Sequence, residues 1–142
     1  MIAMPRKTVY LDGPDCTQDL LDIKWSLRSA GYEIGSTWHD VEGSLSFLGS
    51  AHHWNENRVE QLQICDLLVV VCGDNEKTVL EVPMMAGFAL ARGLSVIWIG
   101  PPVRGLTDFR SVRHYDTAED FRKQILLEVT THADLTRDRL VA

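Results

Sequence analysis

Glu81 is a carboxylate that stands directly before an uncharged stretch of the chain, residues 82–91. One interpretation is structural, because a carboxylate near the start of a helix is stabilised by the positive end of the helix dipole. The other is chemical, because a carboxylate held at the mouth of a pocket can act as a nucleophile. On Glu81 alone, both interpretations stay open.

Polar residues follow four of the hydrophobic runs that predict strands. In open α/β sheets, ligands bind beyond the carboxyl ends of the strands, so these residues are the candidates for a site. Gly, Asp, Asn and Pro are also ordinary turn residues, and each segment alone favours a turn. Together they would bring three loops with carboxylates and a tryptophan to one edge of the sheet. The segments are "DGPD" at 12–15, "STWHD" at 36–40, "GDNE" at 73–76 and "GPP" at 100–102.

The stretch that follows the second expected strand, residues 37–54, has no clear periodicity and is rich in aromatic side chains and histidines. Long loops in compact domains are usually functional or mobile. Trp38 is placed to stack on a planar base, whereas Trp54 is expected to cover the sheet edge. The three histidines match neither H-x-x-x-H nor H-E-x-x-H, so we expect no metal site. P-loop, G-x-G-x-x-G and nucleophile-elbow motifs are absent, and we expect no cofactor.

Hydrophobic periodicity predicts an alternation of strands and helices. Thr17 and Thr117 are expected helix caps, and Gly31 is expected to end the first helix. Alternation of this kind is typical of an α/β fold. Right-handed crossovers favour a flavodoxin-like, Rossmann-like, five-stranded parallel sheet between two helical layers, with the strand order 2-1-3-4-5. The expected strands lie near 7–11, 32–36, 67–72, 95–99 and 111–115, and the helices near 17–30, 55–65, 82–92 and 118–130.

The composition limits the classes of protein to which this chain can belong. With 142 residues, 45% of them hydrophobic and 24% charged, we expect one domain that spans residues 1–142. The net charge of -6 argues against a nucleic-acid partner, which clustered Lys and Arg would attract. The three cysteines form no C-x-x-C pair, and this favours a reducing, cytoplasmic setting. Because no apolar run approaches the roughly 18 residues that span a bilayer, we expect no membrane partner.

In chain order, five segments resemble the nucleoside 2-deoxyribosyltransferase family and its N-glycosidase relatives: "VYLDGP", "STWHD", "ICDLLVVV", an acidic helix start before "GFALARGLSVIWIGPP", and "VRHYDTAEDF". The likeness covers positions 7–128 and lies in the order and spacing of the segments. It implies a flavodoxin-like domain, oligomeric association and a Glu that attacks C1′ of a 2-deoxyribosyl group. Glu81 is then the catalytic nucleophile, and Tyr10 holds it by a hydrogen bond. The implied substrate-binding residues are Asp12, Gly13 and Trp38 around the sugar and base, with Asp74 and Asn75 at the base or a sugar hydroxyl.

Two positions depart from the pattern of the family. When "FALARG" is aligned, Met85 stands where the family has its Glu, and Glu81 lies one helical turn earlier. Residues four apart share a helix face, so Glu81 can still face the pocket. Arg58 stands where the family has an Asp, and an arginine there can pair with a phosphate of the substrate. A helix with Pro83 at its first position avoids an interior proline and places Glu81 just ahead of the helix.

Our leading hypothesis is an enzyme that cleaves the N-glycosyl bond of a 2-deoxynucleoside or its 5′-monophosphate. The sugar would pass to another base or to water. Such chemistry needs a desolvated carboxylate nucleophile, a hydrogen-bond donor for the departing base and a closed pocket. The first alternative is a nucleotide-binding module without catalysis, which the departures at Met85 and Arg58 motivate. The second is an NAD-cleaving glycohydrolase of a related α/β fold.

The segment "PMMAGFALA" at 83–91 also predicts an assembly. Its apolar side chains cannot all face one sheet at about 100° per residue, so a loop or a second subunit must cover the remaining side. Gly87 permits the close approach of another helix, and we expect a homodimer or larger homo-oligomer that packs through this segment. The alternative is a monomer in which residues 41–54 cover the exposed side. The apolar side chains in question are Met84, Met85, Phe88 and Leu90.

Overall fold

A computed structural model of the protein describes residues 7–14, 16–40, 56–72 and 81–131. Strands and helices alternate along these residues, as the periodicity of the sequence predicts. The strands are β1 (Thr8–Asp12), β2 (Glu33–Ile34), β3 (Leu67–Val71), β4 (Ser95–Ile99) and β5 (Val112–Tyr115). The helices are α1 (Gln18–Ser29), α2 (Glu56–Gln63), α3 (Glu81–Ala91) and α4 (Ala118–Thr131), and a short 3₁₀ turn, η1 (Trp38–Asp40), follows β2.

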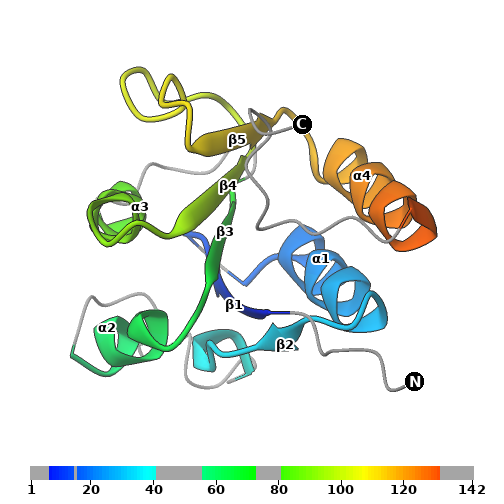
Figure 1. The fold of residues 1–142 in the computed structure, drawn as a ribbon, viewed down its shortest axis with the longest axis horizontal. Helices are drawn as coiled ribbons and strands as arrows, with labels where there is room; N and C mark the ends of the chain where they lie inside the picture. The colour runs from blue at the N-terminus through cyan, green and yellow to red at the C-terminus, as the bar shows by residue number, and fades with distance from the viewer. Residues whose placement is uncertain (1–6, 15, 41–55, 73–80, 132–142) are drawn as a thin grey trace.

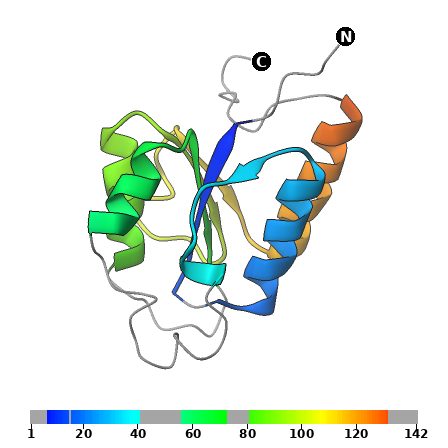
Figure 2. The same ribbon diagram turned by 90° about the horizontal axis from the view of Figure 1, so that it is seen from below.

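The strands form one parallel sheet in the order β2-β1-β3-β4-β5 (Figure 1). Figure 2 shows α1 and α4 on one face of the sheet and α2 and α3 on the other. Because helices cover both faces, β3 is buried along its whole length, which explains its uninterrupted apolar sequence. The predicted flavodoxin-like, three-layer architecture and its strand order are confirmed.

The helix caps that the sequence predicts are also confirmed. Thr17 Oγ1 accepts the backbone N–H of Leu20 at 3.2 Å and caps α1. Gly31, just beyond the end of α1, has a φ of 95°, which only glycine adopts without strain. At the start of α4, Thr117 Oγ1 accepts the N–H of Asp120 at 3.1 Å. These local signals mark both ends of α1 and the start of α4.

The start of α3 differs from the prediction. We expected Pro83 at the first helical position, with Glu81 ahead of the helix, but α3 begins at Glu81 itself. Pro83 therefore lies third in the helix. The first four N–H groups of a helix have no intrahelical acceptor, so a proline within the first turn removes no hydrogen bond.

The second strand is shorter than predicted. The sequence predicts a strand near 32–36, but β2 holds only Glu33 and Ile34. Gly35 extends the pairing by one hydrogen bond, from its N–H to the carbonyl of Val9 at 2.8 Å. Beyond it, side chains replace the backbone of β2 as partners of β1, and these side chains belong to the candidate site.

Among the residues that the structure describes, no helix is both long and apolar enough to cross a bilayer.

Candidate functional site

Tyr10 and Asp12 lie on one face of β1 near its carboxyl end, because side chains two residues apart in a strand point the same way. The chain leaves β1 for β2 on one side, whereas β3 and the later strands lie on the other. Such a reversal of strand order is where open α/β sheets bind their ligands. Both side chains are buried, with Tyr10 0% and Asp12 1% exposed. The predicted edge of the sheet therefore does carry polar groups that are withdrawn from water.

Arg58 joins Tyr10 and Asp12 from α2. Its Nη2 lies 2.5 Å from Asp12 Oδ1, and its Nε donates to the hydroxyl oxygen of Tyr10 at 3.0 Å. Leu62, four residues later, is fully buried, so Arg58 projects from the side of α2 that faces the sheet. A buried charge needs a partner of opposite sign, and Asp12 provides it. We call Tyr10, Asp12 and Arg58 the β1–α2 cluster.

Burial keeps the Tyr10 phenol protonated. Burial raises the pKa of the Tyr10 phenol from 10.0 to about 12, against the opposing effect of the nearby Arg58, while Asp12 adds a smaller upward contribution. At neutral pH, Tyr10 is therefore a hydrogen-bond donor. Because its oxygen already accepts the N–H of Arg58, its own hydrogen can be directed to another acceptor.

Trp38 packs beside the same cluster and is held by the backbone of β1. Its indole N–H donates to the carbonyl of Leu11 at 2.8 Å. The guanidinium carbon of Arg58 lies over the indole, 5.3 Å from the ring centroid, in a cation–π arrangement. Trp38 is 7% exposed. The structure thus places Trp38 against Arg58 of the β1–α2 cluster, and the indole face that Arg58 covers is not open for stacking.

Ser36 and His39 complete this region, and sequence reasoning did not select them as site residues. Ser36 Oγ accepts the N–H of Leu11 at 2.9 Å and lies 2.7 Å from His39 Nε2. The ring of His39 contacts Trp38 edge-on, with the centroids 5.5 Å apart. Ser36 and Trp38 therefore take both backbone groups of Leu11, in the place where a longer β2 would have paired. The motif "STWHD" is the sequence signal that could have identified these residues. Their hydrogen bonds to the backbone of Leu11, however, depend on where β2 ends.

Close packing explains why position 13 holds a glycine. A Cβ atom at this position would lie 2.5 Å from the carbonyl oxygen of Val71 and 3.3 Å from Leu20 Cδ1. Glycine therefore lets the chain after β1 pass close to the end of β3. Its predicted contact with a substrate stays a prediction.

Three of the predicted site residues are not placed by the structure. Glu81 opens α3, but only its backbone is described. Asp74 and Asn75 fall within residues 73–80, outside the described part of the chain. Trp54 and the histidines at 52 and 53 lie outside it as well. Among the predicted residues, the structure thus brings together Tyr10, Asp12, Gly13, Trp38 and Arg58.

The arrangement holds a charge pair and a neutral phenol in fixed orientations. A carboxylate and a guanidinium face each other where water is excluded, so their hydrogen bonds are stronger than the same bonds on the surface. The neutral phenol of Tyr10 accepts a hydrogen bond from the same guanidinium. Together they place an acceptor and a donor at fixed positions beside the indole of Trp38.

Comparison with solved structures shows a related fold. The chain is similar to a 2-deoxyribosyltransferase from the psychrotolerant bacterium Bacillus psychrosaccharolyticus, with a TM-score of 0.57 and 18% sequence identity. The similarity covers 81% of this chain and 90% of the other. At this identity the likeness establishes a common fold, and it agrees with the flavodoxin-like architecture described above.

A second similarity is more distant. The methanol:cobalamin methyltransferase complex MtaBC from Methanosarcina barkeri matches 95% of this chain and 51% of its own, with a TM-score of 0.49 and 14% identity. It is too remote to bear on function. No family model matches the sequence, and no curated protein matches it either.

Proposed function

We propose that this protein cleaves the N-glycosyl bond of 2-deoxynucleosides or their 5′-monophosphates and passes the 2-deoxyribosyl group to another base or to water. The observation that carries the proposal is the β1–α2 cluster, which lies where the strand order of the sheet reverses. The fold, shared with a 2-deoxyribosyltransferase, supports the same conclusion. The order of the sequence segments points independently to that family.

Glu81 is the proposed nucleophile. Its carboxylate oxygen would form a bond to C1′ while the bond between C1′ and the base nitrogen breaks, so the base leaves with the bonding electrons. A second base or a water molecule would then displace the carboxylate from C1′ and regenerate it. The start of α3 supports this assignment, because the positive end of the helix dipole favours an ionised carboxylate there.

Tyr10 is the proposed partner of that carboxylate. Its raised pKa keeps the phenol protonated at neutral pH, and Arg58 already donates to its oxygen. Its hydrogen is thus suited to a carboxylate acceptor, which it would orient toward C1′. In this proposal the phenol positions the nucleophile and does not itself transfer a proton.

Asp12 is the proposed acceptor for a sugar hydroxyl. Arg58 fixes the orientation of the Asp12 carboxylate through Oδ1, and a fixed acceptor aligns the sugar ring for attack. Gly13 and Trp38 would form the adjoining wall of the pocket, with Asp74 and Asn75 toward the base.

The alternative of a binding module, which the departures at Met85 and Arg58 motivate, would use Arg58 as a phosphate ligand. The guanidinium is paired with Asp12, donates to Tyr10 and covers Trp38. A phosphate would have to compete with a buried carboxylate for it, so this geometry weighs against the binding module. In our proposal Arg58 acts on the substrate through Asp12 and Tyr10.

A panel of substrates tests the proposal. The protein is incubated with each 2-deoxynucleoside, each 5′-monophosphate and NAD, with and without an acceptor base, and free base is measured chromatographically. Free base with a new nucleoside indicates a transferase, and free base with free sugar indicates a hydrolase. Release of nicotinamide from NAD alone supports the glycohydrolase. Binding seen by calorimetry without any released base would reject catalysis and support the binding module.

A further inference from the structure

The backbone of Leu11 lies between two residues of the proposed mechanism, Tyr10 and Asp12. On one side, β1 pairs with β3 as far as Asp12. On the other side, two side chains take the place of a strand. Ser36 Oγ accepts the N–H of Leu11 at 2.9 Å, and the carbonyl of Leu11 accepts the indole N–H of Trp38 at 2.8 Å. Tyr10 and Asp12 point to the same face of the sheet, so the place of Leu11 sets how far both reach toward α2.

The hydrogen bonds of Ser36 determine the state of His39. Ser36 is 1% exposed, so its oxygen and its one hydrogen both need partners inside the protein. The oxygen accepts from Leu11, and in the described part of the chain the acceptor within reach of the hydrogen is His39 Nε2, 2.7 Å away. A hydrogen on Nε2 would take this acceptor away and leave a buried donor unsatisfied, which is costly. His39 is therefore neutral, with its ring hydrogen on Nδ1.

His39 is itself held in the interior of the protein. It is 1% exposed, and its ring meets the indole of Trp38 edge-on, with the centroids 5.5 Å apart. Its backbone carbonyl accepts the thiol of Cys16, just ahead of α1, at 3.6 Å. An acceptor fixed in this way keeps the hydrogen of Ser36 pointing at it, so that a lone pair of Ser36 stays directed at Leu11. A continuous chain of contacts thus runs from His39 through Ser36 to Leu11.

We propose that Ser36 and His39 are positioning residues for the cleavage of the N-glycosyl bond. The inference rests on the proposed function and gives a role to two residues that its mechanism does not use. By holding Leu11, they fix where Asp12 meets a sugar hydroxyl and where Tyr10 meets the nucleophile. A misplacement of about 1 Å can slow a reaction by about a hundredfold, so a small shift of β1 is sufficient. Ser36 is not itself a nucleophile here, because its buried oxygen is engaged by Leu11.

Single and double substitutions test this chain of contacts. Ser36→Ala removes the hydroxyl, and His39→Phe removes the acceptor while keeping a ring. Each should lower kcat for base release by about tenfold or more, with KM changed by less than about twofold. The double variant should be no slower than Ser36→Ala, because both substitutions break the same chain. His39→Gln should recover most of the rate, because its side-chain oxygen can accept the hydrogen of Ser36.

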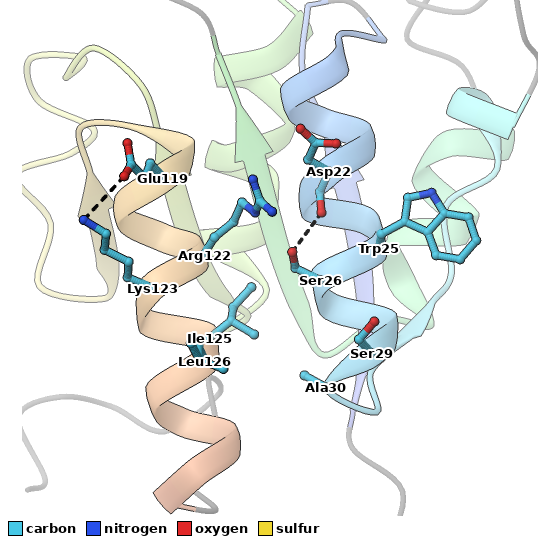
Figure 3. A pocket seen from close by; sticks show the side chains of 10 residues that line it. All are labelled: Asp22, Trp25, Ser26, Ser29, Ala30, Glu119, Arg122, Lys123, Ile125 and Leu126. Carbon is cyan, nitrogen blue, oxygen red and sulfur yellow. Dashed lines mark hydrogen bonds and ion pairs between the residues drawn. The ribbon is translucent and has the colours of Figure 1, made fainter.

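Ser26→Ala is the matched control, because it makes the same chemical change on the other face of the sheet from α2 (Figure 2). Ser26 Oγ donates to the backbone carbonyl of Asp22 at 2.9 Å, at the wall of the hollow between α1 and α4 (Figure 3). Thr37→Val removes a hydroxyl from the residue next to Ser36. That hydroxyl is exposed and accepts from Gln61 at 2.8 Å. Both controls should release base at the rate of the wild type.

Nitrogen NMR of the histidine rings adds a readout that does not depend on activity. The signals that disappear in His39→Gln belong to His39, and at neutral pH they should show a hydrogen on Nδ1 and none on Nε2. Circular dichroism confirms that each variant is folded, so kcat refers to intact protein. A hydrogen on Nε2, additive losses in the double variant, or His39→Gln as slow as His39→Phe overturns the inference. No base from the wild type rejects the proposed function and this role with it, whereas an undiminished rate with Ser36→Ala rejects the role alone.

Discussion

The ion pair between Asp12 and Arg58 has little access to water on either side, with 1% and 5% of the two residues exposed. Removing one partner leaves the other charge buried without compensation, which typically costs about 3–5 kcal/mol. We therefore expect Arg58→Met to lower the free energy of unfolding by about that amount in urea denaturation. Asp12→Asn with Arg58→Met should recover part of the loss, because no uncompensated charge remains.

The exposed pair Lys123–Glu119 is the matched control for this experiment. Its two groups are 3.5 Å apart, but their side chains are 72% and 78% exposed. Exposed pairs contribute about 0–1 kcal/mol, so Lys123→Met should change the stability by no more than that. Equal effects of Lys123→Met and Arg58→Met would contradict the account of a buried, structurally essential pair.

The pKa of Tyr10 gives a second prediction at this scale. Burial raises it to about 12 in the folded protein, from 10.0 in the unfolded chain. Below pH 10 the phenol is neutral in both states. As the pH rises from 10 through 12, only the unfolded chain releases the proton, so the protein loses stability. The loss can reach about 1.4 kcal/mol per pH unit.

Unfolding of the wild type and of Tyr10→Phe at about pH 8 and about pH 11 measures this loss. Tyr10→Phe also lacks the hydrogen bond from Arg58. This loss changes the stability of the variant by the same amount at both pH values, so it does not affect the slope. The stability of the wild type should therefore fall more steeply with pH than that of Tyr10→Phe. Parallel curves would show that Tyr10 ionises in the folded protein as it does in the unfolded chain.

At the scale of elements, local signals predicted most of the structure. Thr17, Gly31 and Thr117 mark helix ends because their side chains or backbone act within one turn. The length of β2 could not be predicted in this way. It depends on whether Leu11 pairs with backbone or with the side chains of Ser36 and Trp38, which lie far from it in the sequence. Tertiary contacts of this kind override strand propensity.

Two glycines test how closely the elements pack. A Cβ at Gly13 would meet the carbonyl oxygen of Val71 at 2.5 Å, whereas a Cβ at Gly87, within α3, would meet nothing within 4 Å. We expect Gly13→Ala to destabilise the protein by about 1–3 kcal/mol through overpacking between β1 and β3. Gly87→Ala should stabilise it by about 0.5–1 kcal/mol, because alanine favours the helix. Thermal denaturation of both variants checks the two signs, and a neutral Gly13→Ala would refute the close approach.

At the scale of the whole molecule, the sequence pattern predicted the sheet order and the edge that carries the polar residues. It did not predict how those residues pair. From its position, Arg58 suggested a phosphate ligand, but in the fold it is tied to Asp12 and Tyr10 across 46 and 48 residues of sequence. Pairing over such a separation follows from the docking of α2 on the sheet, which no local motif encodes. His39 differs from Arg58, because its contact with Ser36 spans only three residues and forms in the local turn η1.

The rate of base release by Glu81→Gln, relative to the wild type, tests the central claim most directly. The matched control is Glu33→Gln, an exposed carboxylate on β2 beside Thr8, at the opposite end of β1 from the site. We predict that the wild type and Glu33→Gln release free base from a 2-deoxynucleoside or its 5′-monophosphate at equal rates. Glu81→Gln should be slower by at least about a thousandfold, because it removes the nucleophile. No base from any substrate with the wild type, or an undiminished rate with Glu81→Gln, would contradict the proposed function.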